Sequence, residues 1–187
     1  MFHGCHRFKG KGIGVWDTSS VTDMSHMFCS AVAFNANIGA WNVSSVEDTT
    51  AMFQSCEAFE GDDIGDWTTA SVRCMTAMFN NCPVFDSDID AWDTASVYDT
   101  AYMFSCCDRF SADISAWHTP CVGDMRLMFA GCVKFDCGIG KWNISGVKNT
   151  DHMLAGASTF RQDLSGWDTS SLESAQSMFE GAHAFEL

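Results

Sequence analysis

The sequence has few prolines, few cationic residues and no long apolar run, and each shortage narrows its class. Only two prolines occur in 187 residues, and no segment approaches the roughly 18 consecutive apolar residues of a membrane-spanning helix. Lysine and arginine number 10 against 24 acidic residues, which gives a formal net charge of −14. Because phosphate backbones are bound by clustered Lys and Arg, we expect no nucleic-acid partner. A hydrophobic content of 47% also excludes a disordered chain.

Familiar motifs for catalysis and targeting are also missing. The sequence contains no GxSxG, P-loop, GxGxxG or CxxC motif. We therefore expect no enzyme activity, catalytic residues, cofactor or metal site. No apolar segment follows Met1, so a secretory signal is not expected and an intracellular location stays open.

What the sequence does contain is repeated. Its seven tryptophans are spaced 25, 26, 25, 25, 25 and 25 residues apart, a period typical of stacked repeats. They are Trp16, Trp41, Trp67, Trp92, Trp117, Trp142 and Trp167. All 15 phenylalanines fall in two columns of this repeat. We interpret residues 1–187 as a single array, with a partial unit at 1–15 followed by about seven units that each start at a Trp.

Recurring apolar columns predict one continuous core shared between units, because no single unit can bury its own aromatic residues. The predicted core consists of the seven tryptophans and one of the phenylalanine columns: Phe34, Phe59, Phe85, Phe110, Phe135 and Phe160. As a specific test, we expect burial and contact with neighbouring units for Trp41, Met78, Phe79, Cys82, Phe85 and Ile89.

Each unit has a pattern typical of one helix and one strand. In residues 19–31 the apolar side chains recur mainly every three or four positions, on one face of a helix. Ser20 with Asp23 resembles a capping box. A short parallel strand is expected near residues 38–43. The sequence thus predicts an α/β solenoid with one short helix and one short parallel strand in each unit of about 25 residues.

The unit Trp-Asp-Thr-Ser-Ser-Val-Thr-Asp-Met-Ser-His-Met-Phe at 16–28, followed by Ala31, Phe34 and Ile38, resembles the repeat of BspA-like leucine-rich-repeat surface proteins. The resemblance covers the chain from Met1 to Phe185. It implies a leucine-rich-repeat-like solenoid used for adhesion or protein binding, and a location at the cell surface or outside the cell.

The candidate interaction face consists of positions that vary between units on the exposed side of the expected helix, together with one further tyrosine one turn away. These residues are His26, Ala51, Ala77, Tyr98, Tyr102, Leu127 and His152. The alternative is that they are ordinary solvated positions. Tyr98 and Tyr102, the only tyrosines, could form a small contact patch.

The cysteines, histidines and acidic residues are each given a structural interpretation beside a functional one. Four cysteines share a column with alanine, which favours buried small side chains over a disulfide or thiolate ladder: Cys56, Cys82, Cys107 and Cys132. His3, Cys5 and His6 could touch a metal, although coincidence is the favoured interpretation. Aspartates beside the expected strand favour turn chemistry over a cation ladder. The sequons at Asn42 and Asn143 fall in the same turn columns.

Two functions remain after these exclusions. The favoured one is a non-enzymatic adhesion module that binds a protein or glycan through its acidic surface. The alternative is a structural or Ca²⁺-binding acidic rod, whose exposed terminal units could associate end to end. A column of threonines also invites an ice-binding face, but Val43 and Ile144 interrupt it.

Overall fold

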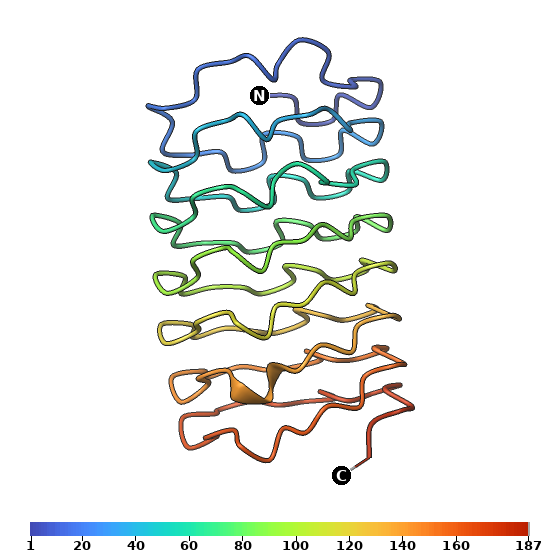
Figure 1. The fold of residues 1–187 in the computed structure, drawn as a ribbon. Coiled ribbons are helices and arrows are strands. Elements are labelled where there is room, and N and C mark those ends of the chain that lie inside the picture. The colour runs from blue at the N-terminus through green and yellow to red at the C-terminus, as the bar shows by residue number, and fades with distance from the viewer. Residues whose placement is uncertain (187) are drawn as a thin grey trace.

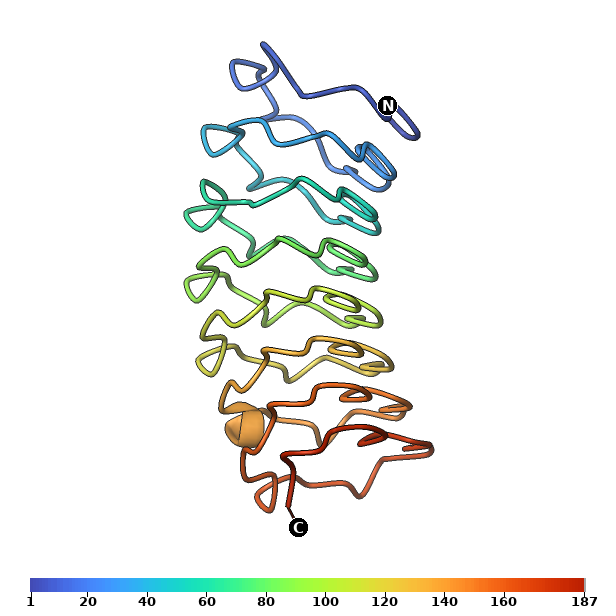
Figure 2. The same ribbon diagram turned by 90° about the vertical axis from the view of Figure 1, so that its right-hand side faces the viewer.

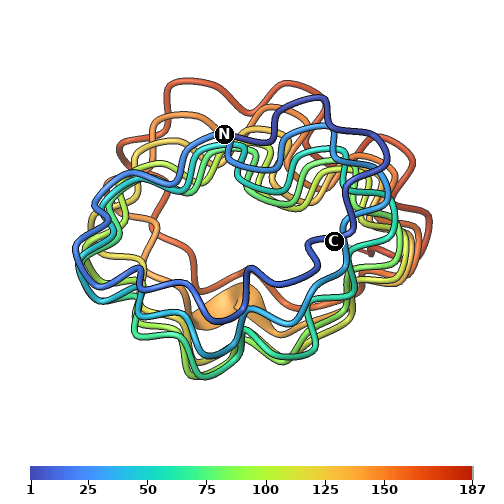
Figure 3. The same ribbon diagram turned by 90° about the horizontal axis from the view of Figure 1, so that it is seen from above.

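The chain winds through a series of coils stacked on one another, with its two termini at opposite ends of the stack (Figure 1). The computed structural model describes residues 1–186. Seen from above, successive coils superpose along one flattened ring, so equivalent residues of neighbouring repeats lie over one another (Figure 3).

Regular secondary structure is almost absent from the coils. Within residues 1–186 the one helix is η1, a three-residue 3-10 turn at Ile139–Lys141 (Figure 2). In the described part of the chain, strand pairing is limited to single-residue parallel bridges that join successive coils along the series Asp23, Asp48, Cys74, Asp99, Asp124, Asn149 and Ser174. The predicted α/β leucine-rich-repeat-like solenoid, with one helix and one strand in each unit, is therefore wrong. No helix in this part of the chain is long and apolar enough to cross a membrane.

Consecutive tight turns occupy the segment where a helix was expected. In the coil that begins at Trp67, Met78 N–H donates to the Met75 carbonyl at 3.1 Å and Cys82 N–H donates to the Phe79 carbonyl at 3.1 Å. The third residue of each turn has a positive φ, +53° at Ala77 and +58° at Asn81. Positive φ at this position is the mark of a type II turn, and it interrupts a right-handed helix. The three-residue apolar spacing therefore comes from linked turns.

The same residues hydrogen-bond to the next coil at every second position. Ala77 N–H donates to Ala101 O at 2.8 Å, Phe79 N–H to Met103 O at 2.9 Å, and Asn81 N–H to Ser105 O at 2.7 Å. The intervening amides donate within their own coil. Backbone groups are thus paired without a helix or a regular strand, which the requirement to satisfy buried polar backbone permits.

The predicted strand near residues 38–43 is also wrong. Trp41 N–H donates to Ile38 O at 3.0 Å and Val46 N–H donates to Val43 O at 2.9 Å, so this segment contains turns. The single-residue bridges lie instead in the segment where the helix was expected, for example between Asp48 and Cys74.

The aromatic core agrees with the sequence prediction. The six residues expected to be buried are all at most 3% exposed. Ring centroids of Phe79 and Phe85 lie 3.9 Å apart within one coil, and Phe79 lies 5.7 Å from Phe104 of the next coil. All six phenylalanines of the predicted core column are 0% exposed. Trp16 departs from the prediction because 39% of its surface is exposed, and Trp167 is only partly buried.

The tryptophans also join coils through their indole nitrogens. Trp92 Nε1–H donates to Ile64 O at 3.1 Å, and Trp117 Nε1–H donates to Ile89 O at 3.0 Å. Each bond satisfies a buried donor with a carbonyl of the preceding coil. The Trp and Ile columns therefore recur together for both packing and hydrogen bonding.

Candidate functional site

Two tyrosines project from the middle of the stack. Tyr98 is 54% exposed and Tyr102 is 37% exposed. The Tyr98 amide donates to Arg73 O at 2.9 Å, and the Tyr102 amide donates to Arg126 O at 2.9 Å. One tyrosine is therefore tied to the preceding coil and the other to the following coil. Fixed backbone and exposed rings favour recognition at low entropic cost, as at many protein-binding surfaces.

The other predicted interaction residues share the same turn position as Tyr102. These six residues have φ between 51° and 61°: His26, Ala51, Ala77, Tyr102, Leu127 and His152. These residues lie in turns and not on a helix. His26 is exposed, whereas Ala77, Leu127 and His152 are partly buried. Ala51 is 2% exposed, so its side chain adds nothing to an outer surface.

A second column of left-handed residues was missed by the sequence analysis, although the sequence contained its signal. It consists of Gly4, Ser30, Ser55, Asn81, Cys106, Gly131, Gly156 and Gly181. Glycine and asparagine are the residues that best tolerate positive φ. Their recurrence inside a supposed helix indicated a turn at this position.

The aspartates beside the Trp column stabilise turns. Asp17 accepts hydrogen bonds from Ser19 N–H at 3.0 Å and from the Ser19 hydroxyl at 2.7 Å. These bonds hold the pKa of the Asp17 carboxyl below its usual value. Asn42 accepts the same two bonds from Ser44, which agrees with the turn interpretation of this column and of the sequon.

Buried polar columns are paired between coils. Thr94 is 2% exposed and its hydroxyl donates to His118 O at 2.6 Å. Thr18, Thr69 and Thr119 bond in the same way to the next coil. Because these four threonines are at most 4% exposed, they present no face to ice or to ordered water. Thr169, the last threonine of the column, is exposed.

The four cysteines of the alanine column are buried, as predicted, and they also donate hydrogen bonds. Cys82 Sγ donates to Phe53 O at 3.0 Å, and Cys107 Sγ donates to Phe79 O at 3.0 Å. Burial raises the pKa of the Cys56 thiol to about 12 and places the pKa of Cys82 and Cys107 well above the ordinary value. All ten cysteines are free thiols, so no disulfide ladder forms.

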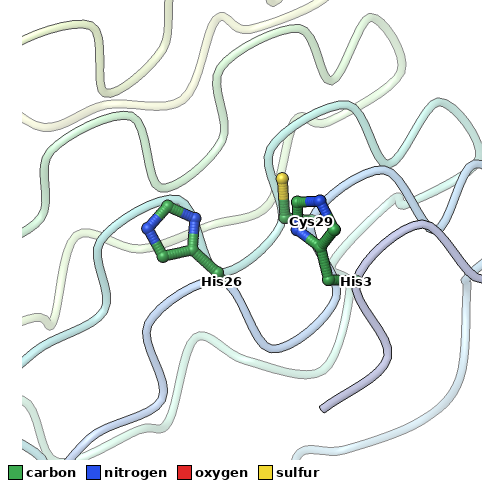
Figure 4. Close-up of side chains that lie close together, drawn as sticks. All are labelled: His3, His26 and Cys29. Atoms are coloured by element: carbon green, nitrogen blue, oxygen red, sulfur yellow. The ribbon is translucent and has the colours of Figure 1, made fainter.

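The candidate metal ligands in the structure differ from the group His3, Cys5 and His6 that lie close together in the sequence. Within residues 1–186, the group of at least three His, Cys or acidic side chains close enough to hold a metal consists of His3, His26 and Cys29. These residues come from two neighbouring coils (Figure 4). Proximity in the folded chain, and not in the sequence, brings them together.

Comparison with known proteins found one family. Residues 1–117 and 84–187 match a family described as "Mycoplasma protein of unknown function, DUF285". No curated protein and no solved structure matches the chain. Together the two matched ranges extend over all the coils, and the chain belongs to the DUF285 family.

Proposed function

We propose that the chain is a non-enzymatic module that binds a protein or glycan by contacts at the outside of its coils. The observation that most supports this proposal is the exposure of Tyr98 and Tyr102 in the middle of the stack, where the Trp and Phe columns are buried. The resemblance to BspA-like surface repeats supports adhesion and a cell-surface location, although residues 1–186 lack the helix and strand expected in each of those repeats.

The buried thiols support a non-enzymatic role. A cysteine nucleophile acts as the thiolate, and its pKa is lowered in sites built for catalysis. Here burial raises the pKa of Cys56, Cys82, Cys107 and Cys132. Their hydrogen bonds to backbone carbonyls further stabilise the protonated form.

Net charge supports a cationic partner surface. With a formal charge of −14, the chain attracts basic patches, and that attraction weakens as ions screen it. The nearby Arg73 and Arg126 are paired with Glu47 and Asp124 at 3.7 and 2.8 Å, so each cation is at least partly neutralised.

The proposal is tested by passing the labelled chain over an array of immobilised glycans and folded proteins. We expect binding to a subset of spots that weakens as salt rises and is lost in the variant Tyr98→Ser/Tyr102→Asn. Asparagine is chosen at 102 because it tolerates the positive φ. Val133→Ser is the matched control, since Val133 is 42% exposed elsewhere on the surface. Equal binding by the tyrosine variant and the wild type would contradict the proposal.

The alternative of a Ca²⁺-binding acidic rod has one supporting feature, a shallow hollow lined by Asp62, Asp63, Asp66, Asp88 and Asp90. Against it, Asp63 accepts hydrogen bonds from Ile38 N–H and Gly39 N–H, and Asp88 accepts one from Asp90 N–H. A melting temperature that rises with added Ca²⁺ would favour this alternative, because a ligand that binds only the folded state stabilises it.

We also propose end-to-end contact between two copies. The last coil of the stack exposes an apolar hollow of about 320 Å³, which is lined in part by Leu164, Trp167, Met178, Phe179 and Phe185. Another hollow, at the opposite end of the stack, is lined in part by Met1, Trp16, Val21, Met24 and Met27. Sedimentation that becomes faster with concentration in the wild type, and not in Phe179→Glu, would support this contact. A monomer at every concentration would oppose it.

A further inference from the structure

The register of the first two coils places His3 directly beside Cys29. Phe2 N–H donates to Met27 O at 2.7 Å, and Gly4 N–H donates to Cys29 O at 2.8 Å. These two bonds flank His3 and fix its position along the next coil. His3 and Cys29 each follow a stacked phenylalanine, Phe2 and Phe28, whose ring centroids lie 5.7 Å apart. The His3 side chain is thereby held over the column that contains Cys29.

A turn brings the second histidine to the same place. Cys29 N–H donates to His26 O at 3.3 Å, which closes the chain between these residues. The imidazole centroids of His3 and His26 are 6.5 Å apart. Each of the three residues has a ligand atom within 4.8 Å of the ligand atoms of the other two. Figure 4 shows the two rings and the sulfur gathered from the neighbouring coils.

The donor set is typical of zinc. Two imidazole nitrogens and one thiolate are ligands that Zn²⁺ prefers, at about 2.0–2.1 Å for nitrogen and about 2.3 Å for sulfur. Ligand atoms around tetrahedral zinc are about 3.3–3.7 Å apart, so the three groups, which lie within 4.8 Å of one another, need to close by no more than about 1.5 Å. Because His3 and His26 are exposed, rotation of their side chains can supply this movement.

Cys29 is held in place by the column beneath it. It is 5% exposed, and its Sγ donates to Gln54 Oε1 at 3.5 Å. Gln54 Nε2 in turn donates to Asn80 Oδ1 at 3.0 Å. This chain of amides holds the protonated sulfur from below. Once Cys29 loses its proton to bind zinc, the Gln54 amide must turn so that its N–H donates to the sulfur, as outer-shell partners of a metal ligand do. The histidines approach from the solvent side, which leaves an entry path for the ion.

We propose that His3, His26 and Cys29 form a Zn²⁺ site with three protein ligands and a fourth position for water. Cys29 releases its proton to solvent when the Zn–S bond forms, and each histidine binds as the neutral imidazole. The site links the first two coils across their interface, so zinc stabilises that end of the stack. This inference does not depend on the binding function proposed above.

The site is tested with Co²⁺ as a spectroscopic substitute for zinc, on the full chain without a histidine tag. We expect one equivalent of Co²⁺ to give a thiolate-to-metal charge-transfer band that added Zn²⁺ abolishes. Cys29→Ala should remove the band, and His3→Asn or His26→Asn should weaken metal affinity more than about tenfold. Asparagine at position 26 tolerates the φ of +54° found there.

Matched controls are the two residues that sequence proximity alone would select, Cys5 and His6. Both are exposed, and Cys5→Ser and His6→Asn should leave the band and the affinity unchanged. A band that survives in Cys29→Ala, or one that Cys5→Ser removes, would overturn the proposal. If Cys29→Ala does not fold, the surface variant His3→Asn decides the question, since unchanged affinity in that variant would also overturn it.

Discussion

At the scale of single residues, each repeat column has a physical role that follows from the chemistry of its side chains. Cysteine replaces alanine in one column and adds a hydrogen bond to the preceding coil, as from Cys107 Sγ to Phe79 O. Threonine in another column joins a coil to the following one, as from Thr94 to His118. Within residues 1–186, every buried side-chain nitrogen or oxygen has a partner. The columns thus recur because stacked coils repeat the same donor and acceptor positions.

The cysteine column predicts a loss of stability in alkaline solution. Its folded-state pKa values lie above the ordinary 9.0, so the stabilisation is complete below pH 9 and is lost as pH rises beyond it. Each thiol contributes a slope of about 1.4 kcal/mol per pH unit in that range. Urea unfolding from pH 8 to 10 should show a smaller slope for Cys82→Ala than for the wild type. The exposed Cys121→Ala is the control, and equal slopes in all three proteins would contradict the prediction.

The aspartate turns predict the opposite dependence in acid. Hydrogen bonds from Ser19 and Ser170 lower the folded-state pKa of Asp17 and Asp168. Their stabilisation is therefore present above the unfolded pKa and is lost as pH falls through the folded pKa. Asp168→Asn should keep the turn, as Asn143 does with Ser145, but reduce the acid dependence of the melting temperature. An unchanged dependence would show that this carboxylate plays no part.

At the scale of elements, the unit is a run of turns joined to its neighbours by hydrogen bonds. The period, the core columns and the turn-forming aspartates could be predicted from the sequence, because apolar spacing and Asx chemistry are local signals. The replacement of the expected helix and strand by turns could not be predicted from these signals. Linked four-residue turns and a helix both place apolar side chains every three or four residues, as at Met75, Met78 and Cys82. Only the column of Gly131, Gly156 and Gly181 distinguished them.

The candidate site residues could likewise be predicted only in part. The exposure of Tyr98 and Tyr102 agrees with the patch suggested by their spacing. The grouping of His3 with His26 and Cys29 depends on coil register, which is set by hydrogen bonds between coils. A search for ligands that lie close together in the sequence cannot detect this register.

Positive φ in the turns gives a prediction at this scale. Ala77 is the third residue of the turn 75–78 and has a φ of +53°. Ala77→Gly should raise the free energy of unfolding by about 0.5–1 kcal/mol, because glycine adopts this region without steric strain. Ala116 occupies the same place in the turn 114–117 without a positive φ, so Ala116→Gly should lower it by about 0.5–1 kcal/mol. The same sign for both variants in urea unfolding would contradict the turn assignment.

At the scale of the whole molecule, stability comes from contacts between successive coils. Aromatic rings repeat from coil to coil, with Phe59, Phe85 and Phe110 separated by 6.2 and 5.9 Å between centroids. Each ring in the middle of the stack is covered on both sides, whereas a ring in an end coil is covered on one. The free energy of unfolding lost when one ring of a column is truncated should therefore depend on its position along the stack.

Truncation of one column tests this dependence. Phe85→Ala should reduce the free energy of unfolding by about 3–5 kcal/mol, because it leaves a cavity between two coils. Phe185→Ala should cost much less, since Phe185 is already partly exposed and contacts Phe160 and Phe179. Urea unfolding measures both values, and equal losses would exclude a stack of this kind.

The central claim is that coils pair through their backbones without a helix, and one coupling measures it directly. In a ¹⁵N,¹³C-labelled sample, scalar coupling across a hydrogen bond should join the amide nitrogen of Phe79 to the carbonyl carbon of Met103, since these groups form a bond of 2.9 Å. The same experiment should join Ala77 to Ala101. Coupling of Phe79 to Met75 instead is the pattern of an α-helix, and it would contradict the account.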